Sequence, residues 1–237
     1  MSERLRVCLV GAGGLVGSAV IRACVGRDDV RLVAVSRREL ALPPGARMEV
    51  LLADPASWAD AIAAARPTVV VSALGTTIRQ VGGDEAAFRA VDHDLVVACA
   101  RWAAEAGARQ FIAVSAIGAD PRAKAFYLRT KGEAEAALTK SGIPRLDLLQ
   151  PSLLLGRRAE RRTAEDLARL VAPLMPLVLH GGLRRYRPIH ADTVAEAILA
   201  LAHEKARGRF IHDYDALHRA IRRHNFERSL DRAKAVD

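Results

Sequence analysis

A glycine-rich loop directly after the first apolar run of the chain constrains the fold more than any other feature of the sequence. The run Leu5–Val10 is short and almost wholly apolar, which is typical of a buried strand. The loop 11–17 follows it without a gap and reads GAGGLVG. Glycine at its first, fourth and last positions permits a tight turn, close approach of a pyrophosphate to the backbone and close packing of the next helix. The loop predicts a strand–turn–helix unit that holds a dinucleotide at the helix N-terminus, and an ordinary tight turn is the alternative.

Strand-like and helix-like stretches alternate along the chain as far as residue 149. Short apolar runs predict strands over residues 5–10, 30–35, 48–52, 68–73, 110–115 and 145–149. Amphipathic stretches predict helices over residues 15–25, 84–106 and about 121–141, and Asp54-Pro55 marks the start of another. Such alternation predicts the α/β class, with a doubly wound parallel sheet of the Rossmann type whose ligands bind beyond the carboxyl ends of the strands.

The regular alternation weakens after Pro151. Short helix-like and strand-like pieces follow, and the last residues are polar. We therefore expect a Rossmann core that binds the cofactor over residues 1–150 and a small C-terminal substrate-side lobe, packed on the core, over residues 151–224. A polar C-terminal tail is expected over residues 225–237.

The composition is that of a globular protein with a basic excess. Hydrophobic residues make up 51% and charged residues 27%, and the formal net charge is +9. Charge alone favours anionic partners of any kind, and few aromatic residues lie among the basic ones, so we expect no nucleic-acid partner. The N-terminal residues show no secretory pattern, and no apolar stretch is long enough to cross a bilayer. The sequence predicts a cytoplasmic protein without a membrane partner.

The cysteines and histidines show no spacing that is typical of a metal site. Cys8, Cys24 and Cys99 are far apart and form no CxxC pair, so we interpret them as buried thiols. The seven histidines offer no local pattern with further ligands. We expect neither a disulfide nor a bound metal.

The residues after the second predicted strand indicate which dinucleotide binds. An NAD site has a carboxylate there, which hydrogen-bonds the ribose 2′-hydroxyl. This chain has Ser36, Arg37 and Arg38 instead, and two guanidinium groups suit a 2′-phosphate. The sequence favours NADP (NADPH) over NAD, and a solvated basic loop is the alternative. Together with these three residues, the candidate cofactor-binding residues of the glycine loop are Gly11, Ala12, Gly13, Gly14, Leu15, Val16 and Gly17.

Two further strand ends are expected to contact the cofactor. Asp54 could accept a hydrogen bond from the adenine amino group, and the alternative is that it caps the helix beginning at Pro55. Ala73, Leu74 and Gly75 end the fourth predicted strand, and their small size would let the adenosine and its ribose pass close to the backbone.

Ser115, Tyr127 and Lys131 form the candidate catalytic trio. Ser115 ends the fifth predicted strand, and Tyr127 and Lys131 form a YxxxK pair on one face of the next predicted helix. A phenol has a pKa of about 10, and a nearby ammonium group lowers it. Tyr127 could then give a proton to the substrate oxygen or take one from it, while Ser115 positions that oxygen and Lys131 holds the nicotinamide ribose. Separately, each residue also fits a structural role: a half-buried tyrosine, a turn serine and a solvated lysine.

These motifs resemble the short-chain dehydrogenase/reductase superfamily. More narrowly, they resemble its atypical branch of small NAD(P)-binding proteins, the group of the mammalian Tat-interacting oxidoreductase. The resemblance covers about residues 5–215. The segments that carry it are GAGGLVG at 11–17, SALGTT at 72–77, FRAVDHD at 88–94, VSAIGAD at 114–120, YLRTKGEAE at 127–135 and QPSLLLG at 150–156.

The resemblance implies that Pro151, Ser152 and Leu153 lie against the nicotinamide. The chain departs from many relatives at Gln150, where arginine is common, and at Asp92, where extended members often have asparagine. Both departures argue against transferring the activity of sugar-nucleotide epimerases to this chain.

The trio and the glycine loop together favour one function. We expect an NADP(H)-dependent oxidoreductase that reduces a carbonyl or oxidises an alcohol of a small-molecule substrate, with Tyr127 as general acid or base. The alternative is a non-catalytic redox sensor that binds NADP(H) and acts on a protein partner.

Overall fold

The computed structural model describes residues 4–156 and 181–234. Its main feature is a seven-stranded parallel sheet in the order β3-β2-β1-β4-β5-β6-β9. The strands are β1 (Leu5–Val10), β2 (Val30–Ser36), β3 (Met48–Leu52), β4 (Val69–Ser72), β5 (Gln110–Val114), β6 (Arg145–Leu149) and β9 (Gly208–His212). Chain order reverses between β1 and β4, so the Rossmann-type α/β class predicted from the sequence is confirmed. A pair of short strands, β7 (Leu154–Leu155) and β8 (Ile189–His190), forms a second small sheet.

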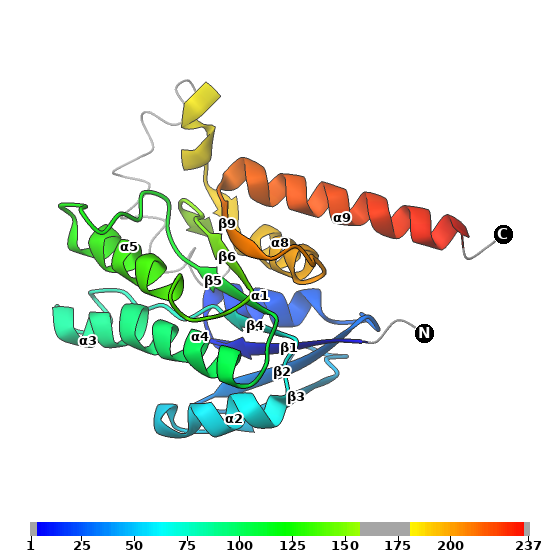
Figure 1. Cartoon of the computed structure of the whole chain (residues 1–237), viewed down its shortest axis with the longest axis horizontal. Helices are drawn as coiled ribbons and strands as arrows, with labels where there is room; N and C mark the ends of the chain where they lie inside the picture. The colour runs from blue at the N-terminus through cyan, green and yellow to red at the C-terminus, as the bar shows by residue number, and fades with distance from the viewer. Residues whose placement is uncertain (1–3, 157–180, 235–237) are drawn as a thin grey trace.

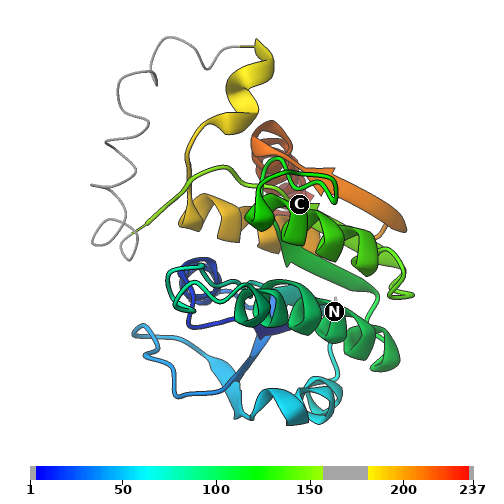
Figure 2. The same ribbon diagram turned by 90° about the vertical axis from the view of Figure 1, so that its left-hand side faces the viewer.

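Helices cover both faces of the main sheet (Figures 1 and 2). On one face α1 (Leu15–Ala23) packs against α8 (Ala191–Ala202), which in turn contacts α9 (Tyr214–Lys234). On the other face α4 (Val96–Glu105) lies between α2 (Trp58–Ala65) and α5 (Phe126–Leu138). α3 (Glu85–Arg89) runs into α4 through a π-helical turn, Ala90–Leu95. Among the described residues, no helix is both long and apolar enough to cross a membrane.

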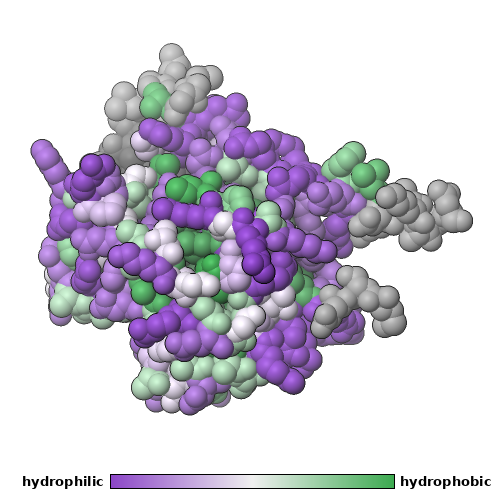
Figure 3. Space-filling model, in the orientation of Figure 1, coloured by the Kyte–Doolittle hydropathy of each residue, from purple (hydrophilic) through white to green (hydrophobic). Residues whose placement is uncertain are grey.

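Two hydrophobic cores lie on the two sides of the sheet. Alternate residues of each strand enter one core or the other, as a pleated strand requires. Leu9 and Ile112 pack beneath α1 and α8, whereas Val10 and Phe111 pack beneath α2 and α4. Most of the outer surface in Figure 3 is hydrophilic, with apolar groups towards the middle of that face and near the end of α9, which carries the exposed residues Phe226 and Leu230.

The structure differs from the sequence-based division of the chain after residue 150. β9 extends the main sheet and α8 packs on α1, so both elements belong to the same body as the Rossmann core. The expected polar tail continues α9 as far as Lys234. The spacing of apolar residues did not predict the C-terminal part of α9, because charged residues lie on most faces of this helix and leave little apolar periodicity. Residues 157–180 of the expected lobe lie outside the described residues.

A buried polar network joins β5, β6 and β9 beneath α8. Asp147 is fully buried and accepts hydrogen bonds from Arg145 at 2.7 Å and from Gln110 at 2.8 Å, and its other oxygen lies 2.8 Å from Nε2 of His212. Burial alone would raise the pKa of Asp147, but the hydrogen bonds from His212 and Arg145 outweigh it and hold that pKa below its usual value. The network thus keeps a carboxylate ionised inside the sheet.

Candidate cofactor-binding and catalytic site

The glycine loop turns from β1 into α1 with little room for side chains. Gly11 has a φ of +81°, and a Cβ there would lie 2.5 Å from the carbonyl carbon of Ala73. A Cβ at Gly17 would lie 2.2 Å from the carbonyl oxygen of Gly11, so this glycine lets α1 pack against the turn. Gly14 is the N-cap of α1 and has no side chain to cap the first backbone N–H groups. Those donors and the helix dipole favour a bound anion.

A cleft of about 1060 Å³ opens in front of this loop at the carboxyl ends of β1, β2 and β4. The predicted cofactor residues that line it are Gly11, Ala12, Gly13, Gly14, Ser36, Arg37, Arg38, Ala73, Leu74 and Gly75. Its position at the reversal of strand order is where doubly wound sheets bind their ligands. The volume, the glycine cradle and the cationic rim fit a dinucleotide.

Other predicted cofactor residues lie outside the lining of this cleft: Leu15, Val16, Gly17, Asp54, Lys131, Pro151, Ser152 and Leu153. Asp54 is exposed and caps the short 3₁₀ helix Pro55–Ser57 without a side-chain hydrogen bond. Ser152 donates a hydrogen bond to the carbonyl oxygen of Arg187, which ties the segment before β7 to the segment before β8. The adenine role of Asp54 and the nicotinamide role of residues 151–153 remain predictions.

Sequence reasoning missed the far wall of the cleft. This wall comes from the loop after β2 and the loop after β4, and its residues are Leu40, Ala41, Leu42, Pro43, Gln80 and Val81. The first four belong to the Pro-Pro-Gly connection, which carries no binding motif. Their position follows only from the fold, because loops at the carboxyl edge of a parallel sheet surround the same cleft.

Arg37 and Arg38 stand at the rim of the cleft with exposed side chains. The hydroxyl of Ser36 donates to the carbonyl oxygen of Arg38 at 2.7 Å and fixes the backbone of this turn. In the described part of the chain, neither guanidinium group takes part in a hydrogen bond or an ion pair. Both remain available to an anionic group that enters the cleft.

Ser115 follows β5, and its hydroxyl donates a 2.5 Å hydrogen bond to Glu135 of α5. Glu135 is buried, and it also accepts hydrogen bonds from the side-chain amide of Gln150 at 2.9 and 3.0 Å. The sequence did not single out Glu135, although it closes the YLRTKGEAE segment eight residues after Tyr127. Glu135 fixes the orientation of the Ser115 hydroxyl and leaves its lone pairs available to accept a hydrogen bond.

Lys131 lies in a buried ion pair with Asp92. The ammonium nitrogen is 2.7 Å from Oδ1 of Asp92, and both side chains are almost completely buried. Oδ2 of Asp92 accepts a 2.7 Å hydrogen bond from the backbone N–H of Thr76, which lines the cleft. The π-helical turn of residues 90–95 holds this carboxylate between α5 and the loop after β4. Asp92 therefore links Lys131 to Thr76 in the cleft lining.

Tyr127 begins the same helix one turn before Lys131, and its ring packs edge-on against Phe88 at 5.9 Å. It keeps 44% of its surface exposed. The protein around it nevertheless removes enough water to raise the pKa of its phenol to about 12, and the carboxylate of Asp92 adds to this rise. Because Asp92 balances the charge of Lys131, the expected lowering of the Tyr127 pKa by that ammonium is absent from this structure.

A glycine one residue after Lys131 sets the position of α5. A Cβ at Gly132 would lie 2.2 Å from the carbonyl carbon of Asp120 and 2.4 Å from the nitrogen of Pro121. The loop after β5 therefore lies directly on the helix that carries Tyr127 and Lys131. In the described part of the chain, no hydrogen bond or ion pair joins the three trio side chains to one another, and each has its own partner.

Replacing Gly14 by valine is expected to weaken NADPH binding while the fold persists. The backbone of Gly14 has a φ of −77°, which any residue adopts, and a Cβ there would meet the carbonyl oxygen of Gly11 at 3.3 Å. The branched side chain would then project over the helix N-terminus, where the pyrophosphate is expected. Calorimetric titration checks the affinity, and circular dichroism checks the fold. Gly14→Ala serves as the milder control, and normal NADPH binding by a folded Gly14→Val protein would show that the cofactor lies elsewhere.

Comparisons with known proteins show the family of the chain. Residues 11–172 match a family described as NAD(P)H-binding. The protein fmp52 of Aspergillus niger is 34% identical over 198 residues, which cover 81% of this chain and 84% of that protein. FMP52 of Eremothecium gossypii is 33% identical over 204 residues, which cover 84% and 88%. The narrower resemblance to the Tat-interacting oxidoreductase group remains a prediction.

Solved structures confirm the fold. MoeE5 in complex with UDP-glucose and NAD superposes with a TM-score of 0.66 at 18% identity, covering 87% of this chain and 74% of that one. UDP-glucose 4-epimerase of Thermotoga maritima has a TM-score of 0.65 at 15% identity, covering 87% and 76%. At such identities the likeness establishes the fold alone.

The same relatives correct one expectation. The fmp52 proteins of Aspergillus niger and Aspergillus fumigatus are named as mitochondrial, which contradicts the predicted cytoplasmic location. That prediction rested on the absence of a secretory pattern, and such an absence does not separate the cytoplasm from an organelle.

Proposed function

Because the chain belongs to the NAD(P)H-binding family, we propose that it is an NADP(H)-dependent oxidoreductase that acts on a small carbonyl or alcohol substrate. The observation that carries this proposal is the continuous path from the cleft through Thr76 and Asp92 to Lys131, one helical turn from Tyr127. In the described part of the chain the Tyr127 phenol has no hydrogen-bond partner, so its proton is available to a substrate oxygen. When bound, the cofactor supplies the hydride.

Each residue of the trio has a distinct task in this proposal. Tyr127 transfers its phenolic proton to the substrate oxygen as the carbonyl carbon accepts hydride. Ser115, held by Glu135, accepts a hydrogen bond from a hydroxyl group of the substrate or product. Lys131, held by Asp92, presents a cation next to the loop that lines the cleft and binds the ribose of the cofactor.

At neutral pH Tyr127 is in the protonated form that carbonyl reduction uses. Its raised pKa keeps the phenol protonated at neutral pH, and a protonated phenol is a proton donor. Reduction needs a donor at this position, whereas alcohol oxidation needs a base. We therefore propose that Tyr127 is the proton donor when a carbonyl is reduced by NADPH.

NADPH is expected to bind more tightly than NADH, and Arg37→Ala or Arg38→Ala is expected to reduce the difference. The two exposed guanidinium groups at the cleft rim can each bind a 2′-phosphate, which only NADP(H) carries. Calorimetric titration of both cofactors measures the preference. Arg47→Ala is a suitable control, because Arg47 is an exposed loop arginine outside the cleft lining. Equal affinities for the two cofactors in the unchanged protein would overturn the assignment of NADP.

A substrate screen decides between an enzyme and a redox sensor. Ketones, aldehydes and quinones are offered with NADPH, and cofactor oxidation is followed by absorbance. Turnover that depends on Tyr127 supports the oxidoreductase. Tight NADPH binding without turnover across a broad panel favours the sensor, whose partner would be a protein.

A further inference from the structure

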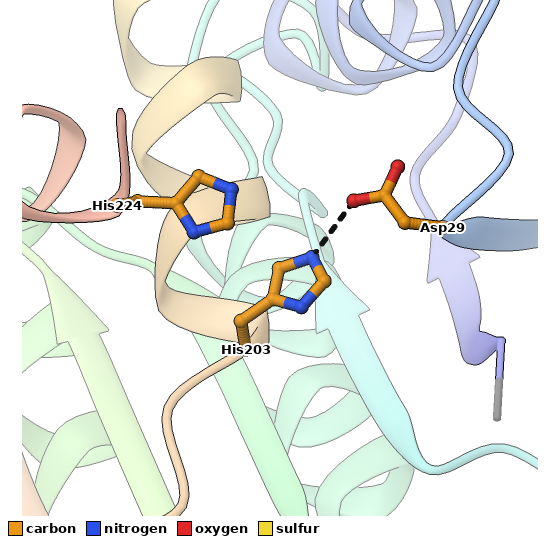
Figure 4. A group of neighbouring side chains, drawn as sticks. All are labelled: Asp29, His203 and His224. Atoms are coloured by element: carbon orange, nitrogen blue, oxygen red, sulfur yellow. Dashed lines mark ion pairs between the residues drawn. The ribbon is translucent and has the colours of Figure 1, made fainter. Parts of the chain in front are cut away.

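A second polar cluster lies at the opposite edge of the sheet from the cofactor cleft. Figure 4 shows Asp29, His203 and His224 facing one another, although they come from three separate parts of the chain. Asp29 directly precedes β2, His203 is the C-cap of α8, and His224 lies within α9. Their ligand atoms lie within 4.8 Å of one another. The cluster is therefore built by tertiary packing, and no local spacing in the sequence could reveal it.

The contact between His203 and Asp29 is an ion pair without a hydrogen bond. Nε2 of His203 is buried and has no hydrogen-bond partner among the described residues, although Oδ2 of Asp29 lies 3.2 Å away. Two ligands of one tetrahedral zinc ion, each about 2.05 Å from the metal, are separated by roughly 3.3 Å. The His203 nitrogen and the Asp29 oxygen therefore have the separation of two metal ligands. The ring of His224 stacks on that of His203 at 4.8 Å and is nine-tenths buried.

The guanidinium group of Arg27 lies against two members of the cluster. Nη2 of Arg27 lies 2.5 Å from Oδ2 of Asp29 and 3.5 Å from Nε2 of His224. The other hydrogen bond of Arg27, from Nε to Oδ1 of Asp29, measures 3.0 Å and could persist if Nη2 moved away. A carboxylate that binds a metal through one oxygen commonly accepts an outer hydrogen bond on the other.

We propose that Asp29, His203 and His224 form a binding site for a divalent transition-metal ion such as Zn²⁺, with Arg27 Nη2 as the cation that the metal displaces. Two imidazole nitrogens and one carboxylate oxygen make a ligand set that zinc accepts with water in the fourth position. The negative end of the α8 dipole at His203 favours a cation. Arg27 and the nearby Arg228 oppose it, so the charge of Arg27 limits the affinity.

A metal bound at this site would hold α8 and α9 against the segment that precedes β2. Its ligands join the start of β2 to the end of α8 and to α9. The bound metal is expected to stabilise the folded state in proportion to its concentration and affinity. Because the cleft lies at the carboxyl ends of the strands, NADPH binding is expected to be independent of the metal.

Zinc titration with matched variants tests the proposal on protein that carries no histidine tag. We expect one Zn²⁺ per chain by calorimetry and a higher melting temperature with zinc. His203→Gln and His224→Gln are expected to weaken zinc binding by at least about tenfold. Replacing residues that only hydrogen-bond to metal ligands already causes a loss of that size. His190→Gln, which alters an exposed histidine, is expected to leave the affinity unchanged.

Arg27→Met separates the metal site from a purely structural cluster. It keeps the length of the side chain but removes the competing cation, so zinc is expected to bind more tightly than to the unchanged protein. Visible absorption of Co²⁺ bound to this variant should change when His203 is also replaced. The proposal is overturned if neither the unchanged protein nor folded Arg27→Met binds zinc, or if binding persists undiminished in both histidine variants.

Discussion

Turnover of a carbonyl substrate is expected to fall by roughly 10²- to 10⁴-fold when Tyr127 is replaced by phenylalanine, the range for losing a general acid. The change removes only the phenolic oxygen, so the edge-on contact with Phe88 and the buried pair of Lys131 with Asp92 are retained. NADPH affinity should therefore stay close to that of the unchanged protein. Steady-state kinetics with the best substrate of the screen, together with calorimetry, measure both quantities.

The pH dependence gives this prediction a second readout. The phenol donates its proton while it remains protonated, and its raised pKa of about 12 keeps it so throughout the neutral and mildly alkaline range. The Tyr127-dependent rate should not decline there from loss of that proton. Tyr214→Phe is the control, because Tyr214 packs against His218 at the start of α9. Full activity in the Tyr127→Phe protein would refute the proposed proton transfer.

The free energy of unfolding is expected to fall by about 3–5 kcal/mol when Asp147 is replaced by alanine. Its carboxylate is the acceptor for Arg145, whose side chain is also buried. Without Asp147 the guanidinium group would stay inside the sheet with only its hydrogen bond to the carbonyl oxygen of Ala206 and its place over the Phe210 ring. Urea unfolding followed by circular dichroism measures the loss.

Two comparisons show whether that loss comes from the buried charge. Asp147→Asn keeps an acceptor oxygen and should lose less than Asp147→Ala. Glu49→Ala breaks a surface ion pair with Arg31, in which both side chains are about half exposed, and it should change stability little. If the alanine variant at Asp147 unfolds at the same urea concentration as the unchanged protein, the network does not stabilise the fold.

The sequence was most informative where the local pattern and the fold require the same residues. β1, β3 and β6 were predicted with the observed bounds, because short apolar runs beside turn residues have few other interpretations. β9 was missed, since Gly208 and Arg209 give its first half no strand pattern and the strand forms by pairing with β6. The glycine loop lies at the cleft as expected, because tight packing requires glycine at positions 11 and 17 and the predicted cofactor contact requires glycine in the same loop.

The surroundings of the trio could not be predicted, because they depend on tertiary contacts. Asp92 was noted as an unusual residue, but its pairing with Lys131 needs the π-helical turn to place the carboxylate beside α5. Glu135 lies one helical turn beyond Lys131, and the pattern alone does not indicate that it faces Ser115. The raised pKa of Tyr127 was contrary to the expected lowering, since that reasoning counted the lysine charge but neither the burial of the phenol, which is the larger cause, nor the carboxylate of Asp92.

The polar network of β5, β6 and β9 also bears on how the chain assembles. Parallel strands pair through evenly spaced backbone hydrogen bonds, and the hydrophobic pattern specifies the register only weakly in a strand that is largely exposed and begins with glycine, as β9 does. In the observed register His212 of β9 pairs with Leu149 of β6. Asp147 lies two residues before Leu149 on the same face of β6, so the ring of His212 reaches its carboxylate. A slip of β9 by one residue would turn His212 to the other face and leave the carboxylate short of a donor. The hydrogen bond between His212 and Asp147 is therefore made in the observed register and would be lost in a register shifted by one residue.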